Sequence, residues 1–89
     1  MADYSVTFAR SARKELEKLP SSVAPRIIEH IEELLISPRT TRSVKLQGNR
    51  SLWRIRVGDY RVIYQVNDAA RIIDVSIIGT DAMRIAVSN

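Results

Sequence analysis

The chain has 89 residues, of which 45% are hydrophobic and 27% charged, and its formal net charge is +4. This is the composition of one ordinary globular domain, residues 1–89, because a second domain would have too little apolar surface to bury. The absence of cysteine excludes disulfides and thiolate metal sites, and a single histidine leaves little material for a zinc site or a Ser-His-Asp triad. No apolar run approaches the roughly 20 residues of a membrane span, and the N-terminus lacks a secretory pattern, so we expect a cytoplasmic location.

A short strand followed by a helix is predicted for the first twenty residues. Residues 4–8 alternate between apolar and polar side chains, as a half-buried strand does. Either Thr7 or Ser11 is a suitable N-cap for the helix, and Pro20 ends it. The apolar stripe of this helix consists of Ala9, Ala12, Leu16 and Leu19.

A second helix follows after a few residues and ends at Ser37, because the residue before Pro38 is disfavoured in helical geometry. Ser21 and Ser22 are its N-cap candidates. His30 lies on its outer face, where a lone histidine is more often solvated than catalytic. The short connection predicts an antiparallel helical hairpin packed on a sheet. The buried stripe of the second helix consists of Ile27, Ile31, Leu34 and Leu35.

Three strands are predicted for the C-terminal half. Residues 39–50 have a loop composition, anchored on the core by Val44 and Leu46. Residues 51–66 form two alternating strands around the two-residue turn Gly58-Asp59. Residues 67–70 form a four-residue turn into a last strand, 71–78. The expected fold is α+β, with an antiparallel sheet of about four strands and the N-terminal helical hairpin on one face.

The turn at residues 58–59 also predicts which residues face one another. It places Arg56 opposite Arg61, and Trp53 opposite Tyr64. Because side chains alternate across a strand, Trp53 and Tyr64 lie on a core face and the arginines on the other. Tyr60 and Tyr64 are accordingly predicted to be packing residues. For the last strand, Val66 opposite Arg71 would place Ile73, Val75 and Ile77 in the core and Asp74 diagonal to Arg61.

We call the positions of Arg54, Arg56 and Arg61 the arginine face. Like charges directly opposite one another destabilise a sheet, and Asp74 neutralises one guanidinium at most. Arginine suits bidentate phosphate recognition, so the face indicates a binding site for a polyanion such as nucleic acid. The alternative is a basic surface that is solvated or that binds an acidic partner protein. Residues 38–61 carry seven basic side chains against Asp59 alone, a net of +6: Arg39, Arg42, Lys45, Arg50, Arg54, Arg56 and Arg61.

The order strand–helix–helix–three strands resembles the RelE/ParE family of type II toxins, and is closer to the RelE-type mRNA interferases. The residues that carry the resemblance are Ala12, Leu16 and Leu19-Pro20, then Ser37-Pro38, Lys45-Leu46, Trp53-Arg54-Ile55-Arg56 and Gly58-Asp59-Tyr60-Arg61-Val62-Ile63-Tyr64. RelE-type members resemble microbial ribonucleases in fold and cleave mRNA in the ribosomal A site. ParE-type members act against DNA gyrase. Both kinds are held inactive by a cognate antitoxin.

The resemblance implies a metal-independent endoribonuclease that needs no cofactor and whose partners are an antitoxin, mRNA and the ribosome, with no membrane. It implies catalytic roles for Arg54, Arg56 and Arg61, and we expect Arg84 to supply a further catalytic cation. The basic segment predicts RNA-binding roles for Lys45, Arg50, Arg42 and Arg39. RelE-type enzymes usually carry a tyrosine in the tail after the last strand, and none follows Gly79 here. The alternatives are a ParE-like gyrase inhibitor and a catalytically weakened homologue that acts mainly through antitoxin binding.

Overall fold

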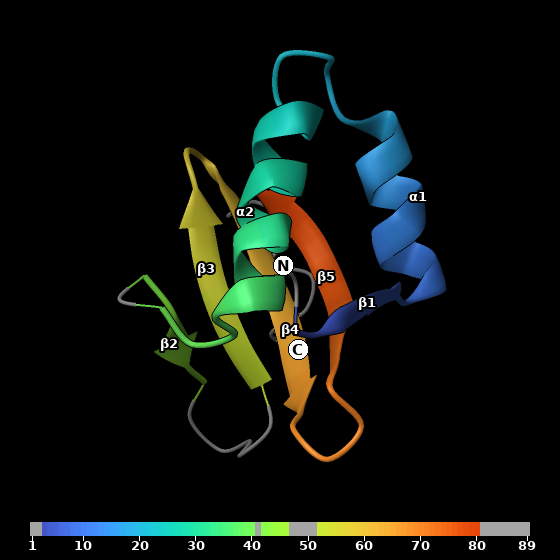
Figure 1. Ribbon diagram of the computed structural model, residues 1–89. Coiled ribbons are helices and arrows are strands. Elements are labelled where there is room, and N and C mark those ends of the chain that lie inside the picture. The colour runs from blue at the N-terminus through green and yellow to red at the C-terminus, as the bar shows by residue number, and fades with distance from the viewer. Residues whose placement is uncertain (1–2, 41, 47–51, 81–89) are drawn as a thin grey trace.

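Two helices cover one face of a single sheet (Figure 1). The computed structural model describes residues 3–40, 42–46 and 52–80. The helices and strands are β1 (Ser5–Phe8), α1 (Arg10–Lys18), α2 (Ala24–Ile36), β2 (Val44–Lys45), β3 (Leu52–Val57), β4 (Tyr60–Asn67) and β5 (Ile72–Thr80). This confirms the predicted α+β class with a helical hairpin on one side of the sheet.

The sheet has five strands rather than about four, in the order β1-β5-β4-β3-β2. The additional strand is β2, a two-residue segment inside the predicted loop that pairs antiparallel with β3. β1 pairs in parallel with β5, so that Ser5 lies beside Ile72 and Phe8 beside Val75. The sheet is therefore mixed, because the first strand enters it at the edge beyond the last strand.

Both helices lack side-chain caps at their N-termini. The N-cap residues are Ala9 and Val23, and neither makes a side-chain capping bond. The Thr7 hydroxyl instead donates to Asp74 Oδ1 on β5 at 2.7 Å. Before α2, the Val23 N–H donates to the Pro20 carbonyl at 2.9 Å, so a backbone turn leads into the helix. The predicted caps were therefore wrong for all four candidates, Thr7, Ser11, Ser21 and Ser22.

The hydrophobic core lies between the helices and the sheet. Each helix contributes the stripe that its spacing predicts, and the sheet contributes the face that carries Tyr64. A fully buried isoleucine or leucine contributes about 1.5–3 kcal/mol relative to an exposed one, so this layer holds the sheet in place. The buried core residues are Ala12, Ile27, Ile31, Leu34, Ile55, Val57, Val62, Tyr64, Ile73, Val75 and Ile78.

The β4–β5 turn lies one residue later than predicted. Residues 68–71 form the turn, and Asn67 Oδ1 accepts the Ala70 N–H at 3.0 Å. Arg71 closes the turn with φ 57°, in the left-handed region. Val66 consequently pairs with Ile73 and not with Arg71. The register differs from the prediction by two residues at this end, which leaves each side chain on its predicted face.

A β-bulge then changes the faces in the second half of β5. The register shifts between Ile63 and Tyr64, so that Ile63 pairs with Ile77 and Val62 with Ile78. Because one extra residue reverses the alternation, Ile78 enters the core with 0% exposure. The predicted core position of Ile77 was therefore wrong, and this side chain lies on the arginine face beside Ile63.

Candidate nucleic-acid interface

The β3–β4 hairpin has the predicted register throughout. Arg56 pairs with Arg61, and Val57 pairs with Tyr60 on either side of the turn. Gly58 adopts φ 61°, a left-handed conformation that a residue with a Cβ adopts only at a cost. The turn therefore sets the register, and the register places the arginines on the sheet face opposite the helices.

The arginine face presents three guanidinium groups at different depths. The Arg56 side chain is exposed, Arg54 is half-buried, and Arg61 is only 7% exposed. Arg61 lies between Arg56 on β3 and Gly79 on β5, and the glycine has no side chain to occupy the neighbouring position. Burial lowers the local dielectric constant, so a guanidinium in this position attracts an anion more strongly than an exposed one.

Asp74 lies farther from Arg61 than predicted. It is on the arginine face, but it pairs with Gln65 and not near Arg61. Gln65 is four positions from Arg61 along β4, which is about 13 Å. Asp74 Oδ1 accepts the Thr7 hydroxyl instead. The expected partial neutralisation of Arg61 by Asp74 was therefore wrong.

Arg39, predicted to bind RNA, is held in a polar cluster at the opposite end of the sheet from the β3–β4 turn. Its guanidinium donates to both carboxylate oxygens of Asp68, with Nη2 2.7 Å from Oδ2, and lies 5.5 Å from the Trp53 ring centroid. The Tyr4 hydroxyl donates to Asp68 Oδ1 at 2.7 Å. The Arg39 and Tyr4 hydrogen bonds hold the pKa of Asp68 below its usual value. The charge of Arg39 is thus balanced by Asp68.

Arg42 contacts the second helix. Its Nη1 is 2.7 Å from His30 Nε2, and His30 Nδ1 is 2.8 Å from the Arg26 carbonyl oxygen. A guanidinium can only donate, so His30 Nε2 accepts and Nδ1–H donates to the carbonyl. His30 is therefore a link between α2 and the following loop.

The remaining predicted residues do not join the arginine face within the part of the chain that the structure describes. Lys45 pairs with Trp53, so its side chain lies on the helix side of the sheet. Arg50 and Arg84 lie outside the described residues. Of the eight predicted site residues, the structure brings together Arg54, Arg56 and Arg61.

Arg26 was missed by the sequence analysis. It lies on α2, and its Nη2 and Nη1 are 3.8 and 3.9 Å from the position that a Cβ on Gly58 would occupy. Its guanidinium therefore lies over the β3–β4 turn, two residues beyond Arg56. No sequence pattern links residues so far apart in the chain; the packing of α2 on β3 creates this contact.

Tyr64 lies in the core as predicted, with a polar end. Its hydroxyl donates to the Pro38 carbonyl at 2.7 Å and lies 2.9 Å from Ser43 Oγ. Burial raises the pKa of this phenol above its usual value. Tyr64 thus anchors the loop after α2, whereas Tyr60 packs against the core from a half-buried position.

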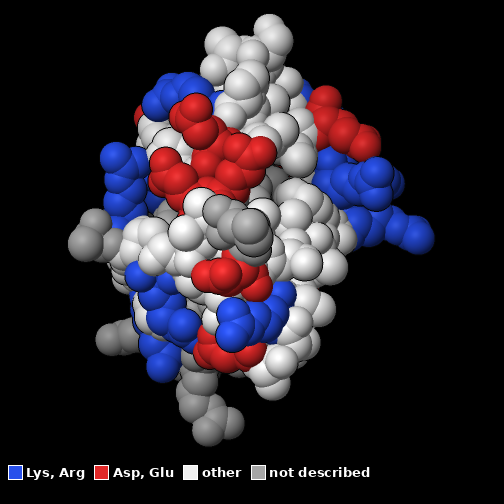
Figure 2. Space-filling view, viewed as in Figure 1, with Lys and Arg blue, Asp and Glu red and all other residues white. Residues whose placement is uncertain are grey.

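The helix side of the molecule carries a different charge pattern. Figure 2 shows acidic side chains gathered over α2, flanked by basic ones. The exposed acids of this helix are Glu29, Glu32 and Glu33. A polyanion would be repelled by α2, so the opposite face of the sheet is the better candidate interface.

Two negative findings apply to the residues that the structure describes. No group of three or more His, Cys, Asp or Glu side chains there is arranged to hold a metal ion. No described helix is long and apolar enough to cross a membrane.

Comparison with known proteins identifies the family. Residues 6–85 match the ParE toxin family of type II toxin–antitoxin systems, parDE. The mRNA interferase toxin RelE of Escherichia coli (strain K12) is 33% identical over 78 residues, which are 85% of this chain and 81% of that protein.

Solved structures agree with this assignment. A chain of the intact E. coli RelBE toxin–antitoxin complex has a TM-score of 0.79 at 33% identity, over 86% of this chain and 95% of its own. A chain of the archaeal RelE–RelB complex from Pyrococcus horikoshii OT3 has a TM-score of 0.76 at 32% identity, over 88% of this chain and 94% of its own. The present chain therefore belongs to the RelE/ParE family of type II toxins, as its sequence motifs predict.

Proposed function

We propose that this toxin inhibits translation by cleaving mRNA in the ribosomal A site, with the arginine face as its phosphate-binding site. The single observation that carries the proposal is the direct pairing of Arg56 with Arg61, with Arg54 two residues along the same face. A sheet under selection for stability alone would place acids opposite these arginines. The 33% sequence identity to the mRNA interferase toxin RelE of E. coli gives independent support.

The arginines supply the electrostatic part of the reaction. When a 2′-hydroxyl attacks the adjacent phosphate, the nucleophile belongs to the RNA itself, and negative charge accumulates on the phosphate in the transition state. The buried Arg61 and the exposed Arg56 would bind the two sides of this phosphate, and Arg54 would bind a neighbouring one. Arg84 would add a further cation, in place of the basic residue that RelE-type enzymes usually carry just beyond the glycine of the last strand.

The arginines are poor candidates for the proton transfers. Arginine keeps its proton at any cellular pH, so it neither accepts the 2′ proton nor releases one to the leaving 5′ oxygen efficiently. The proton transfers therefore require other groups, either from this chain or from the ribosome.

A cognate antitoxin is the proposed protein partner. RelE is bound by RelB in the E. coli, P. horikoshii and Methanococcus jannaschii complexes. We expect an antitoxin to bind this chain in the same general way and to keep it inactive.

Expression without an antitoxin, followed by mapping of mRNA 5′ ends, tests the proposal. Arg56→Ala is the most informative variant, because its side chain is exposed and its removal leaves no cavity. Loss of one transition-state donor lowers a rate by about 10²–10³-fold, so cleavage should fall below detection in a short induction. Arg10→Ala is the matched control, since Arg10 is an exposed arginine on α1, on the helix side.

The charge of Arg61 is tested by Arg61→Lys rather than by alanine, because the residue is 7% exposed and truncation would also remove packing. Lysine keeps the charge but loses the bidentate geometry, so partial activity is expected. Intact transcripts in cells whose growth is arrested by the wild-type toxin would refute mRNA cleavage.

Inhibition of DNA gyrase is the second candidate function, and the match to the ParE family favours it. In that case, purified toxin would block supercoiling by gyrase, and mRNA in arrested cells would remain uncut. Arg56→Ala would then have no effect on supercoiling unless the same face binds gyrase.

A further inference from the structure

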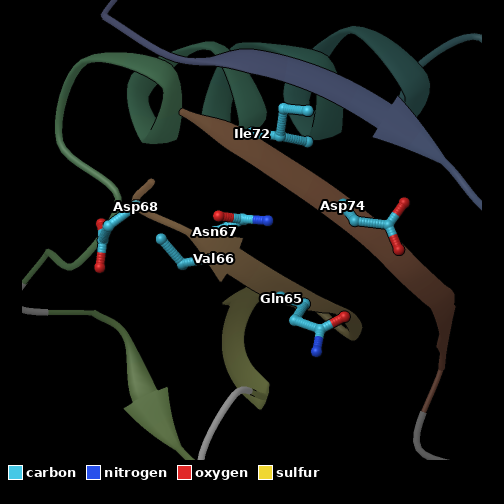
Figure 3. A pocket seen from close by; sticks show the side chains of 6 residues that line it. All are labelled: Gln65, Val66, Asn67, Asp68, Ile72 and Asp74. Carbon is cyan, nitrogen blue, oxygen red and sulfur yellow. The ribbon is translucent and has the colours of Figure 1, made fainter. Parts of the chain in front are cut away.

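A cavity of about 380 Å³ lies on the arginine face of the sheet, at the end away from the β3–β4 turn. Figure 3 shows its walls, which come from the last residues of β4, the β4–β5 turn and the first residues of β5. Its lining is mainly polar. The lining residues are Gln65, Val66, Asn67, Asp68, Ile72 and Asp74.

Three side chains offer hydrogen-bonding groups to this cavity. Gln65 on β4 and Asp74 on β5 are paired residues, so both lie on the same face of the sheet. Asp74 uses Oδ1 to accept from Thr7, and Asn67 uses Oδ1 to accept from Ala70. Within the described chain, the Gln65 amide, the Asn67 amino group and Asp74 Oδ2 have no further hydrogen bond. Two donor groups and two acceptor atoms therefore remain for a ligand.

The charges of the cavity decide which part of a nucleic acid fits it. Asp68 is balanced by the two hydrogen bonds from Arg39. Asp74 makes no ion pair with any described residue, so its carboxylate repels a phosphate. A neutral group with N–H donors is favoured in its place, because a carboxylate without a counter-ion accepts such hydrogen bonds strongly.

The cavity continues the phosphate-binding site along the same strands. Gln65 is four residues from Arg61 on β4, which is about 13 Å. A single strand whose phosphate lies at Arg56 and Arg61 can therefore extend along β4 toward the cavity. Phosphate contacts give such a complex most of its affinity, whereas amide and carboxylate side chains discriminate between bases.

We propose that this cavity binds one unpaired nucleobase of the RNA whose phosphate lies on the arginine face. The proposal rests on the proposed function. Asp74 Oδ2 accepts from an exocyclic amino group, and the amides of Gln65 and Asn67 donate to the ring nitrogen beside it. Cytosine, adenine and guanine each have an amino group beside a ring nitrogen, and uracil has no amino group. The cavity therefore prefers an amino-bearing base.

A nuclear magnetic resonance titration tests the proposal, because the side-chain amides of Gln65 and Asn67 are directly observable. The probes are single-stranded RNA hexamers of cytidine, adenosine or uridine, and inorganic phosphate. We expect the cytidine and adenosine hexamers to shift these amide signals at concentrations at least about fivefold lower than the uridine hexamer requires. Inorganic phosphate should shift only signals near Arg56.

Two substitutions sharpen the test. Asp74→Asn retains an acceptor for Thr7 but replaces the anionic acceptor, and should reduce the preference over uridine to less than about twofold. Asp59→Asn makes the same change at an exposed position in the other turn and should retain the preference. An unchanged preference in Asp74→Asn refutes the inference.

The readouts separate this inference from the proposed function. Shifts at the arginines without shifts at Gln65 and Asn67 would overturn the cavity as a base site and leave phosphate binding intact. Shifts in the cavity together with uncut mRNA in cells would overturn the proposed function alone. If N-acetylarginine amide occupies the cavity at lower concentration than cytidine, the site takes a cationic protein side chain and the inference is wrong.

Discussion

Removal of the Tyr64 hydroxyl should destabilise the protein by about 2 kcal/mol. The phenol ring is 0% exposed, and its hydroxyl makes two contacts, with the Pro38 carbonyl at 2.7 Å and Ser43 Oγ at 2.9 Å. Each hydrogen bond contributes about 0.5–1.5 kcal/mol net, and the Pro38 carbonyl loses its donor in Tyr64→Phe. The loop between α2 and β2 loses its anchor on β4.

The assay is urea unfolding followed by circular dichroism. The transition midpoint should fall with little change in slope, because the surface exposed on unfolding is nearly the same. In thermal unfolding, the loss corresponds to about 8–16 °C for a domain of this size. Tyr60→Phe is the matched control: Tyr60 is on the same strand and face, its hydroxyl makes no hydrogen bond to a described residue, and we expect a change within about 0.5 kcal/mol.

The pH dependence gives a second readout. Burial raises the folded-state pKa of Tyr64. The contribution of the neutral phenol to folding stability is therefore fully present below the unfolded pKa of about 10, and it is lost as pH rises through the folded pKa. Tyr64→Phe should therefore lose less stability than the wild type between neutral and strongly alkaline pH. The reasoning is refuted if Tyr64→Phe and Tyr60→Phe have equal stability and equal alkaline profiles.

Three further predictions concern the turns and the core. The pKa of Asp68 is lowered by its hydrogen bonds from Arg39 and then from Tyr4. Its contribution to folding stability is therefore present above the unfolded pKa of about 3.9 and is lost as pH falls through the folded pKa. In an acid titration, the stability of Asp68→Asn should fall less steeply than that of the wild type. Gly58→Ala should cost about 1–2 kcal/mol because of φ 61°, whereas Gly58→Asn should cost less, and equal midpoints in urea would contradict this account. Ile27→Ala should cost about 2–5 kcal/mol in the same assay because Ile27 is 0% exposed, and a loss below 1 kcal/mol, on the order of an exposed-site change, would contradict its core position.

The parts of the fold that local rules control could be predicted from the sequence. A two-residue turn at Gly58 leaves one register for β3 and β4, so the pairing of Arg56 with Arg61 follows directly. The β4–β5 connection is longer, and a left-handed Arg71 and a β-bulge both alter the register. Neither has a signature in single residues, because a non-glycine residue with positive φ and an inserted residue are stabilised by neighbouring strands.

The candidate site, like the fold, could be predicted only in part from the sequence. The three arginines of the arginine face were predictable because alternation within one hairpin places them together. The proximity of Arg26 to Gly58, the pairing of Arg39 with Asp68 and the distance of Asp74 from Arg61 all depend on how separate elements pack. Such contacts join distant parts of the chain, and charge patterning along the sequence does not specify them.

The parallel pairing of β1 with β5 has a consequence for synthesis of the toxin. Ser5 pairs with Ile72, and Phe8 with Val75. β1 therefore has no neighbouring strand in the sheet until β5 has been synthesised. Chains emerge from the ribosome N-terminal end first, and contacts between distant residues form slowly. The β3–β4 hairpin, which carries the arginine face, is therefore synthesised before the rest of the sheet can form around it. A nascent toxin should become competent only after nearly the whole chain has been made, which delays its action on the ribosome that produces it.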